Sequence, residues 1–197
     1  MMQPSLFEPA GPQVLLDDDS GRIVLAADVV SDSLASRWFD ALRAHVSWNE
    51  GRRLMYEREV DVPRLRAHFN VDDPCVPPVL LEALAAVNGV AAAPYDSIGL
   101  NFYRDRHDSV APHNDKLADL VRGQPIALLS LGATRRMTIR AKAPPKRVLR
   151  LDLEQGSVII MSWLTQLHYD HGIPKEIAAR GPRISLAFRV RGSGARR

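Results

Sequence analysis

The chain has 197 residues, of which 46% are hydrophobic and 25% are charged, and its formal net charge is +3. This composition is typical of one globular domain and excludes a disordered or collagen-like chain. The longest apolar stretch, residues 77–94, is interrupted by Glu82 and Asn88, so we expect no membrane partner.

Cysteine usage and the amino-terminal sequence both favour a cytoplasmic location. Cys75 has no second cysteine with which to form an internal disulfide, as is usual in a reducing compartment. The first residues show no basic end followed by a long apolar run, so no secretory signal is expected. Residues 121–197 contain 15 Lys or Arg and 4 Asp or Glu. This basic half suggests a nucleic-acid partner, and a solvated basic surface is the alternative.

The first part of the chain is expected to be a flexible leader followed by two helices. Residues 1–22 are rich in Pro, Asp and Gly and form the leader. Residues 32–46 are predicted to be helical, because apolar residues recur every four positions after a Ser and an Asp that can cap the amino end. Residues 78–88 are predicted to form a second helix, which starts at a proline and ends before a glycine.

From residue 97 onward the pattern changes to short strands separated by turns that contain Gly or Pro. Six segments are rich in β-branched, aliphatic or aromatic residues: 97–103, 125–131, 135–141, 146–153, 157–163 and 183–190. Regularly spaced short strands predict a sandwich, a barrel or a jelly roll. The expected fold class is α+β and mainly β, with amino-terminal helices packed on the β core of a single domain, residues 23–197.

A candidate metal site follows the first of these strands. His113 and Asp115 are two residues apart, so in an extended segment both side chains lie on one face. Such a pair alone is a weak signal, because it also arises by chance or from a local hydrogen bond. A third ligand is available further on, and the candidates are His168, Asp170 and His171. Two histidines and one carboxylate match the facial triad of non-haem Fe(II) oxygenases, which leaves three positions open for a co-substrate and O2.

The last strand contains two arginines that point to one face. Arg183 and Arg189 are six residues apart, and the small residues Ser185 and Ala187 share their side of the strand. Small residues indicate that this face is turned inward, where an arginine is costly unless it meets an anion. A dicarboxylate could satisfy both guanidinium groups. The alternative is two surface arginines on a basic strand.

Four segments in combination resemble the AlkB family of Fe(II)- and 2-oxoglutarate-dependent dioxygenases. LNFYRDRHDSVAPHND is similar to the family's N-x-Y-x-D-G-x-D followed by H-x-D, and QPIALLSLGATRRMTIR to its P-I-x-x-x-S-x-G strand and the next strand. GSVIIMSWLTQLHYDHGIPK resembles the segment that ends in the distal iron histidine, and PRISLAFR resembles R-x-N-x-T-F-R. The resemblance implies a double-stranded β-helix (jelly-roll) catalytic core at residues 98–191, with residues 23–97 forming a helical part and a substrate-recognition lid.

The resemblance also implies an iron site and a co-substrate site. Fe(II) would be held by His113, Asp115 and His171, with 2-oxoglutarate and O2 as co-substrates. His171 is preferred because the family's ligand is followed by a short apolar turn. The family's co-substrate positions fall on Asn101, Tyr103, Arg183, Ser185 and Arg189. Asn101, Tyr103 and Arg183 would bind the far carboxylate, and Arg189 would lie near the carboxylate that chelates iron. Ser185 stands where the family commonly has asparagine.

The activity implied by the resemblance is oxidative demethylation of N-alkylated nucleobases in DNA or RNA, a repair of alkylation damage. The products would be formaldehyde, succinate and CO2. The substrate candidates are Arg64, His68, Phe69, Leu117, Arg135 and Arg136, and for Phe69 a role in the buried core is the alternative. Three further basic residues complete the expected strand-binding surface: Arg140, Lys142 and Lys146. The protein is expected to act as a monomer.

Two departures from the family fall in the substrate pocket. Leu117 stands where repair enzymes usually carry an acid that faces the cationic base, and VDDPCVPPVLLEAL replaces an expected aromatic hairpin. Three alternatives therefore stay open: an AlkB-like hydroxylase of a protein or small molecule, a non-catalytic nucleic-acid-binding module, and a zinc-binding jelly-roll hydrolase. The paired arginines argue against the hydrolase, because a hydrolytic zinc site needs no dicarboxylate clamp. Salt-sensitive binding that survives His113→Ala would identify the binding module.

Overall fold

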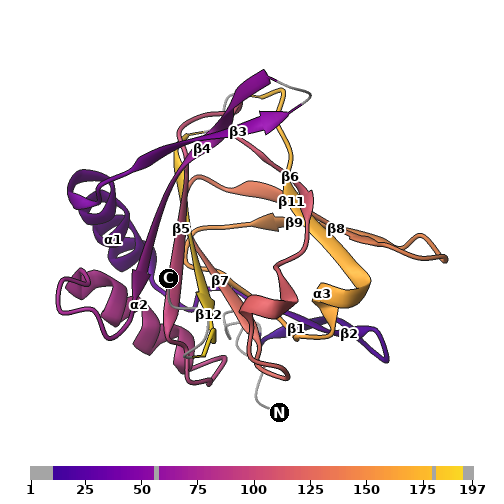
Figure 1. Cartoon of the computed structure of the whole chain (residues 1–197). Helices are drawn as coiled ribbons and strands as arrows, with labels where there is room; N and C mark the ends of the chain where they lie inside the picture. The colour runs from indigo at the N-terminus through magenta and orange to yellow at the C-terminus, as the bar shows by residue number, and fades with distance from the viewer. Residues whose placement is uncertain (1–10, 56–57, 179–180, 193–197) are drawn as a thin grey trace, which may run out of the picture.

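The molecule is built from two antiparallel sheets, with the helices of residues 32–45 and 78–88 on the outer face of the larger sheet (Figure 1). The structure, a computed structural model, describes residues 11–55, 58–178 and 181–192, and of residues 52–55 and 58–62 it describes only the backbone. The helices are α1 (Asp32–His45), α2 (Pro78–Asn88) and α3 (Thr165–His168), with a 3-10 turn η1 (Leu117–Asp119). The strands are β1 (Gln13–Asp18), β2 (Gly21–Ala26), β3 (Asn49–Met55), β4 (Arg58–Asn70), β5 (Ser97–Tyr103), β6 (Val110–His113), β7 (Ile126–Gly132), β8 (Arg135–Ala141), β9 (Val148–Leu153), β10 (Val158–Met161), β11 (Tyr169–Ile173) and β12 (Arg183–Arg189).

The two sheets face each other as in a jelly roll, which confirms the expected fold class. The larger sheet has the order β1-β2-β10-β7-β12-β5-β4-β3, and the smaller sheet has the order β6-β11-β8-β9. In the middle of the larger sheet, neighbouring strands are distant in the sequence, since β12 lies between β5 and β7. The β3–β4 hairpin extends along the top of the molecule in Figure 1, and the β8–β9 hairpin projects to the right.

The hydrophobic core has two layers, one on each face of the larger sheet. On β12, Ile184, Leu186 and Phe188 pack with the helices, while Ala187 faces the smaller sheet. The same alternation with period two occurs on β5 and β7. Central strands buried on both faces appear in the sequence as almost continuous apolar runs, which is why these strands were predicted correctly.

The amino-terminal prediction was partly wrong. Residues 13–22 do not form a leader, because they make up β1 and the start of β2 at the edge of the larger sheet; residues 1–10 lie outside the described residues. Residues 23–97 contain α1 and α2 as expected, and they also contain most of β2 and the whole of β3 and β4. Only Leu16 of β1 is buried, so the pairing with β2 holds this strand in place and its own sequence gives little strand signal.

Membrane insertion by a helix finds no support in the part of the chain that the structure describes. None of its helices is long and apolar enough to cross a bilayer.

Candidate metal centre and co-substrate pocket

His113, Asp115 and His171 come together between the sheets. His113 ends β6 and faces His171 of β11 directly across an antiparallel pair, with 4.6 Å between the ring centroids. Asp115 follows two residues after His113, and one ligand atom from each residue lies within 4.8 Å of the others. Two histidines and one carboxylate at this spacing could hold a divalent metal ion.

The protonation of this group suits a metal. Burial is the main cause that lowers the pKa of His171 to about 3, so its imidazole is neutral and carries a free lone pair at neutral pH. His113 Nδ1 lies 2.9 Å from the Ala111 carbonyl oxygen. Because a carbonyl can only accept, Nδ1 carries the proton and Nε2 is left as the ligand atom.

Asp115 is held by an arginine as well as by its place in the chain. Arg189 Nε donates to Oδ2 of Asp115 at 2.7 Å, and Nη2 donates to Oδ1 at 3.0 Å. Burial alone would raise the pKa of Asp115, but the Arg189 guanidinium, together with His171 and His113, more than offsets this and keeps the pKa below its ordinary value. A carboxylate has about four lone-pair sites, so the two hydrogen bonds leave room for a metal.

Behind the metal group lies an inner cavity of about 40 Å³ whose walls include all five predicted co-substrate residues. Asn101 and Tyr103 on β5 pair directly with Ser185 and Arg183 on β12. The neighbouring strands therefore turn four of the five side chains to the same side. The fifth residue, Arg189, lies further along β12, toward the metal group.

Arg183 is a buried cation with an incomplete set of partners. Its side chain is fully buried, and Nη2 donates to Ser130 Oγ at 2.9 Å. Nε and Nη1 are buried without a hydrogen-bond partner among the described residues. Burial lowers the pKa of Arg183 to about 10, so the group is still charged at neutral pH. A buried guanidinium with two unused nitrogen donors is a ready site for a carboxylate.

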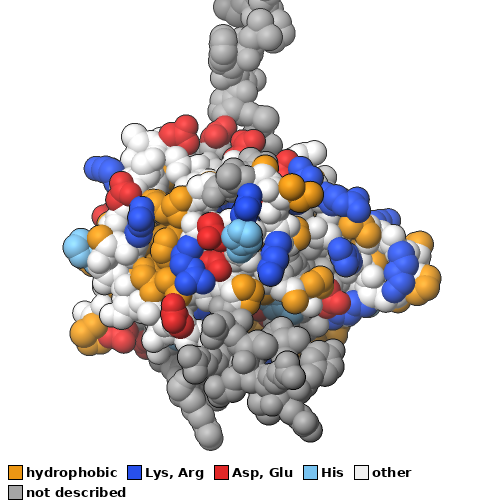
Figure 2. Space-filling view, turned by 90° about the horizontal axis from the view of Figure 1, so that it is seen from above, with side chains coloured by type: hydrophobic (Ala, Val, Ile, Leu, Met, Phe, Trp, Pro, Cys, Tyr) orange, Lys and Arg blue, Asp and Glu red, His pale blue; other side chains and the backbone are white. Residues whose placement is uncertain are grey.

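An outer cleft of about 430 Å³ opens from the inner cavity and shares Arg64, Asn101, His113 and Arg189 with it. Arg64, Arg66 and His68 alternate along β4 and line the cleft; the two arginines are charged, whereas burial lowers the pKa of His68 below its ordinary value. Figure 2 shows Lys, Arg and His side chains gathered around acidic ones near the middle of the face seen from above. The cleft suits a substrate that carries negative charge near the metal group.

The candidates on β4 divide according to the face of the strand. Arg64 and His68 line the outer cleft, and Arg64 Nε donates to Asn101 Oδ1 at 2.7 Å. Phe69 was wrong as a substrate residue, because it lies on the opposite face and packs against the core beneath α1 and α2. The structure places Leu117 in η1, half-buried, and it is not among the residues that line the cleft or the inner cavity.

Arg135 was wrong as a strand-binding residue. It is fully buried, since β8 turns Arg135, Met137 and Ile139 inward. Its guanidinium donates to the carbonyl oxygens of Asp105 at 2.9 Å, Asp108 at 2.8 Å and Pro174 at 3.0 Å. It also lies 5.5 Å from the Tyr103 ring centroid, a cation–π contact. Arg135 therefore ties together the loops around the inner cavity.

Arg136 is exposed and forms a bidentate pair with Asp152 on β9.

The adjacent arginines Arg135 and Arg136 give a matched pair for a stability experiment. We expect Arg135→Met to lower the free energy of unfolding by about 3–5 kcal/mol, because it leaves three buried carbonyl groups without their donor. Arg136→Met should leave the free energy of unfolding nearly unchanged, as for an exposed ion pair. Urea denaturation of both variants measures the difference, and equal effects would contradict the role given to Arg135.

The sequence analysis did not name several residues that line the cleft, among them Arg66, Arg191 and Asn49. Arg191 continues the alternation of Arg183, Ser185 and Arg189 and lines the cleft, so an extended period-two pattern could have found it. Asn49 also lines the cleft. Its position depends on pairing with Arg66 across the β3–β4 hairpin, and no local signal predicts it.

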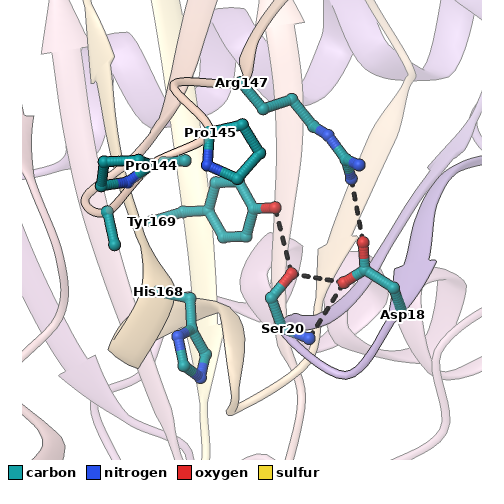
Figure 3. A pocket seen from close by; sticks show the side chains of 9 residues that line it. Asp18, Ser20, Pro144, Pro145, Arg147, His168 and Tyr169 are labelled. Atoms are coloured by element: carbon teal, nitrogen blue, oxygen red, sulfur yellow. Dashed lines mark hydrogen bonds and ion pairs between the residues drawn. The ribbon is translucent and has the colours of Figure 1, made fainter.

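A separate hollow of about 180 Å³ lies between the β1–β2 turn and the β8–β9 hairpin (Figure 3). Its polar groups already bind each other: Ser20 Oγ bonds to Asp18 and to the Tyr169 hydroxyl, and Arg147 donates to Asp18. His168 stands on its wall (Figure 3), so the fold turns this histidine away from the group formed by His113, Asp115 and His171.

Comparisons with known proteins support the metal group and the co-substrate pocket described above. A profile of the 2OG-Fe(II) oxygenase superfamily matches residues 70–189. The chain is similar to alpha-ketoglutarate-dependent dioxygenase alkB homolog 3 from Bos taurus, with 29% identity over 95% of this chain and 73% of that protein. It is 38% identical to the Homo sapiens protein of the same name over 49% of this chain and 36% of that protein. It is 34% identical to the Homo sapiens DNA oxidative demethylase ALKBH2 over 57% of this chain and 46% of that protein.

Solved structures share the fold at low identity. OsALKBH1 aligns with a TM-score of 0.56 and 19% identity, covering 85% of this chain and 97% of that one. A Pseudomonas putida prolyl-4-hydroxylase aligns with a TM-score of 0.58 and 14% identity, covering 86% and 93%. At such identities the likeness shows a common architecture alone.

Proposed function

Because the chain belongs to the AlkB family of the 2OG-Fe(II) oxygenase superfamily, we propose that it is a dioxygenase that removes N-alkyl groups from nucleobases in DNA or RNA. Its reaction would consume 2-oxoglutarate and O2 and release succinate, CO2 and formaldehyde. Cys75 is the single cysteine of the chain, and it is exposed and free. This supports the proposal that the protein works in a reducing compartment such as the cytoplasm.

The observation that carries the proposal is buried Arg183 at the floor of the inner cavity. Its unused Nε and Nη1 donors match the far carboxylate of 2-oxoglutarate, and Tyr103 and Asn101 stand beside it. His113, Asp115 and His171 would hold Fe(II) at the other end of the cavity. When bound, the iron supplies the activation of O2 that accompanies decarboxylation of the co-substrate. The residues of the chain supply the geometry that brings these groups together.

The outer cleft supports a nucleic-acid substrate. Arg64, Arg66, His68 and Arg191 line it above the metal group, where they could hold phosphates on either side of a base. A base within a duplex must be flipped out or arrive single-stranded to reach the metal. The names of the relatives add support, since the ALKBH2 protein is called a DNA oxidative demethylase.

Two assays in sequence test the proposal. The protein is first titrated with Fe(II) and 2-oxoglutarate without oxygen, and a weak visible charge-transfer band is expected. Oligonucleotides that contain 1-methyladenine or 3-methylcytosine are then incubated in air, with unmodified oligonucleotides as the control. Formaldehyde and succinate should form in equal amounts from the methylated strands only.

The outcomes separate the alternative functions. A band with succinate but without formaldehyde would contradict demethylation and favour a hydroxylase of a protein or small molecule. Neither band nor succinate would contradict the dioxygenase itself. Salt-sensitive oligonucleotide binding in the presence of a chelator would then favour a non-catalytic binding module.

A further inference from the structure

Gln166 connects the short helix before β11 to the metal group. Its side chain is 1% exposed, and Oε1 accepts the backbone N–H of Asp115 at 2.9 Å. The amide nitrogen donates to Thr165 Oγ1 at 3.2 Å, so both ends of the buried amide are bonded. Gln166 lies in α3, five residues before His171. Gln166 therefore links the segment that leads to His171 with the backbone of Asp115 through a direct hydrogen bond.

Lys142 contacts the neighbours of all three predicted ligands. Its Nζ donates to the Gln166 carbonyl oxygen and to Asn114 Oδ1, each at 2.8 Å. Asn114 lies between His113 and Asp115 in the chain. Lys142 Nζ also lies 3.7 Å from Oδ1 of Asp170, which immediately precedes His171. The expectation that Lys142 is a free strand-binding cation was wrong, because its ammonium group is bound within the protein.

The ladder between β6 and β11 pairs His113 with His171 but does not reach Asp115. β6 has four residues at the edge of the smaller sheet, and its register with β11 shifts between His171 and Ile173. Gly172 allows the strands to approach closely there, since an added Cβ would lie 2.8 Å from the Val110 carbonyl oxygen. Asp115 lies beyond the end of β6. The hydrogen bond from its N–H to Gln166 fixes a backbone that no strand pairing holds.

We propose that Gln166 and Lys142 are positioning residues that hold the segment of His113 and Asp115 in place against the segment of His171. Neither residue is itself a predicted metal ligand: Gln166 bonds to the backbone N–H of Asp115, and Lys142 bonds to Asn114 and to the Gln166 carbonyl oxygen. The inference rests on the proposed metal site. Outer partners of metal ligands typically change metal affinity by about 10- to 100-fold when they are removed, and ligand sets need rigid support to bind well.

The test compares Gln166→Met, which keeps the length of the side chain and removes the acceptor, with Gln166→Glu, which keeps an acceptor oxygen. Gln155→Met is the matched control, because Gln155 Oε1 likewise accepts a backbone N–H, from Gly132 at 3.0 Å. Mn(II) affinity is measured by calorimetry on the metal-free protein, and circular dichroism verifies the fold. We expect about 10- to 100-fold weaker Mn(II) binding for Gln166→Met, recovery for Gln166→Glu, and no change for Gln155→Met.

A second pair of variants tests the role of the Lys142 ammonium group. Lys142→Met should weaken Mn(II) binding and alter the visible absorption of the Co(II)-loaded protein at saturation, a change that a general loss of stability would not produce. Lys146→Met is the control, since Lys146 lies four residues further along the same hairpin and is exposed. It should leave both readouts unchanged.

Failure of the positioning role and failure of the proposed function give different results. If wild-type protein binds Mn(II) and folded Gln166→Met and Lys142→Met bind it equally well, the positioning role is overturned and the metal site stands. If wild-type protein does not bind Mn(II), the metal site and this inference fall together. A variant that is too unstable for calorimetry is instead compared by the rise in its melting temperature when Mn(II) is added. A rise equal to that of wild type would also overturn the role.

Discussion

Asp115→Asn is expected to reduce succinate formation below detection and to weaken Mn(II) binding by more than about 100-fold, beyond the loss typical of an outer partner. The substitution changes the shape of the side chain very little, but it removes the only carboxylate of the predicted ligand set. It also turns one acceptor oxygen of the bidentate pair with Arg189 into a donor. A neutral amide is a poorer ligand for a divalent cation than a carboxylate.

Asp119→Asn is the matched control for this experiment. Asp119 lies four residues further on, in η1, and it is not among the residues that line the outer cleft or the inner cavity. The same charge is therefore removed nearby without a predicted effect on the metal. Thermal denaturation shows whether Asp115→Asn is folded when its activity is measured. Wild-type Mn(II) affinity in folded Asp115→Asn would contradict the proposed ligand set.

Arg183→Met is expected to weaken 2-oxoglutarate binding by at least about 30-fold while leaving the co-substrate-free protein as stable as wild type, or more stable. Truncating one partner of a buried charged pair costs about 2–5 kcal/mol of binding. In the absence of an anion, however, the buried guanidinium destabilises the folded protein. Burial lowers its pKa to about 10, and an apolar side chain in place of an unpaired buried charge is often neutral or stabilising.

The two effects of Arg183→Met have opposite signs and are measured together. Calorimetry with 2-oxoglutarate in the presence of Mn(II) gives the loss of affinity, and melting temperatures without co-substrate give the stability. Adding 2-oxoglutarate should raise the melting temperature of wild type and of the exposed control Arg136→Met, but not that of Arg183→Met. If Arg183→Met binds 2-oxoglutarate normally, the far carboxylate lies elsewhere.

Local sequence patterns were sufficient to predict the strands at the centre of the molecule. The strands that lie deepest in the sheets, β5, β7 and β12, appear in the sequence as apolar runs with period-two alternation. This alternation also predicts that Asn101 and Tyr103, like Arg183 and Arg189, point to one side. The His113 and Asp115 pair was likewise readable from its spacing. The edge strands β1 and β3, and β4 beside β3, gave weaker signals, because they carry many charged residues and depend on their partners for their structure.

Only the tertiary structure decided which basic residues can meet a substrate. Arg135 and Arg136 are neighbours of the same type, yet Arg135 is fully buried and binds three carbonyl groups, while Arg136 is exposed and pairs with Asp152. Lys142 and Lys146 differ in a similar way, since Lys142 supports the predicted metal ligands. Sequence periodicity shows which residues share a face. Whether that face is covered depends on chain segments far away, and these meet only when the two sheets pack together.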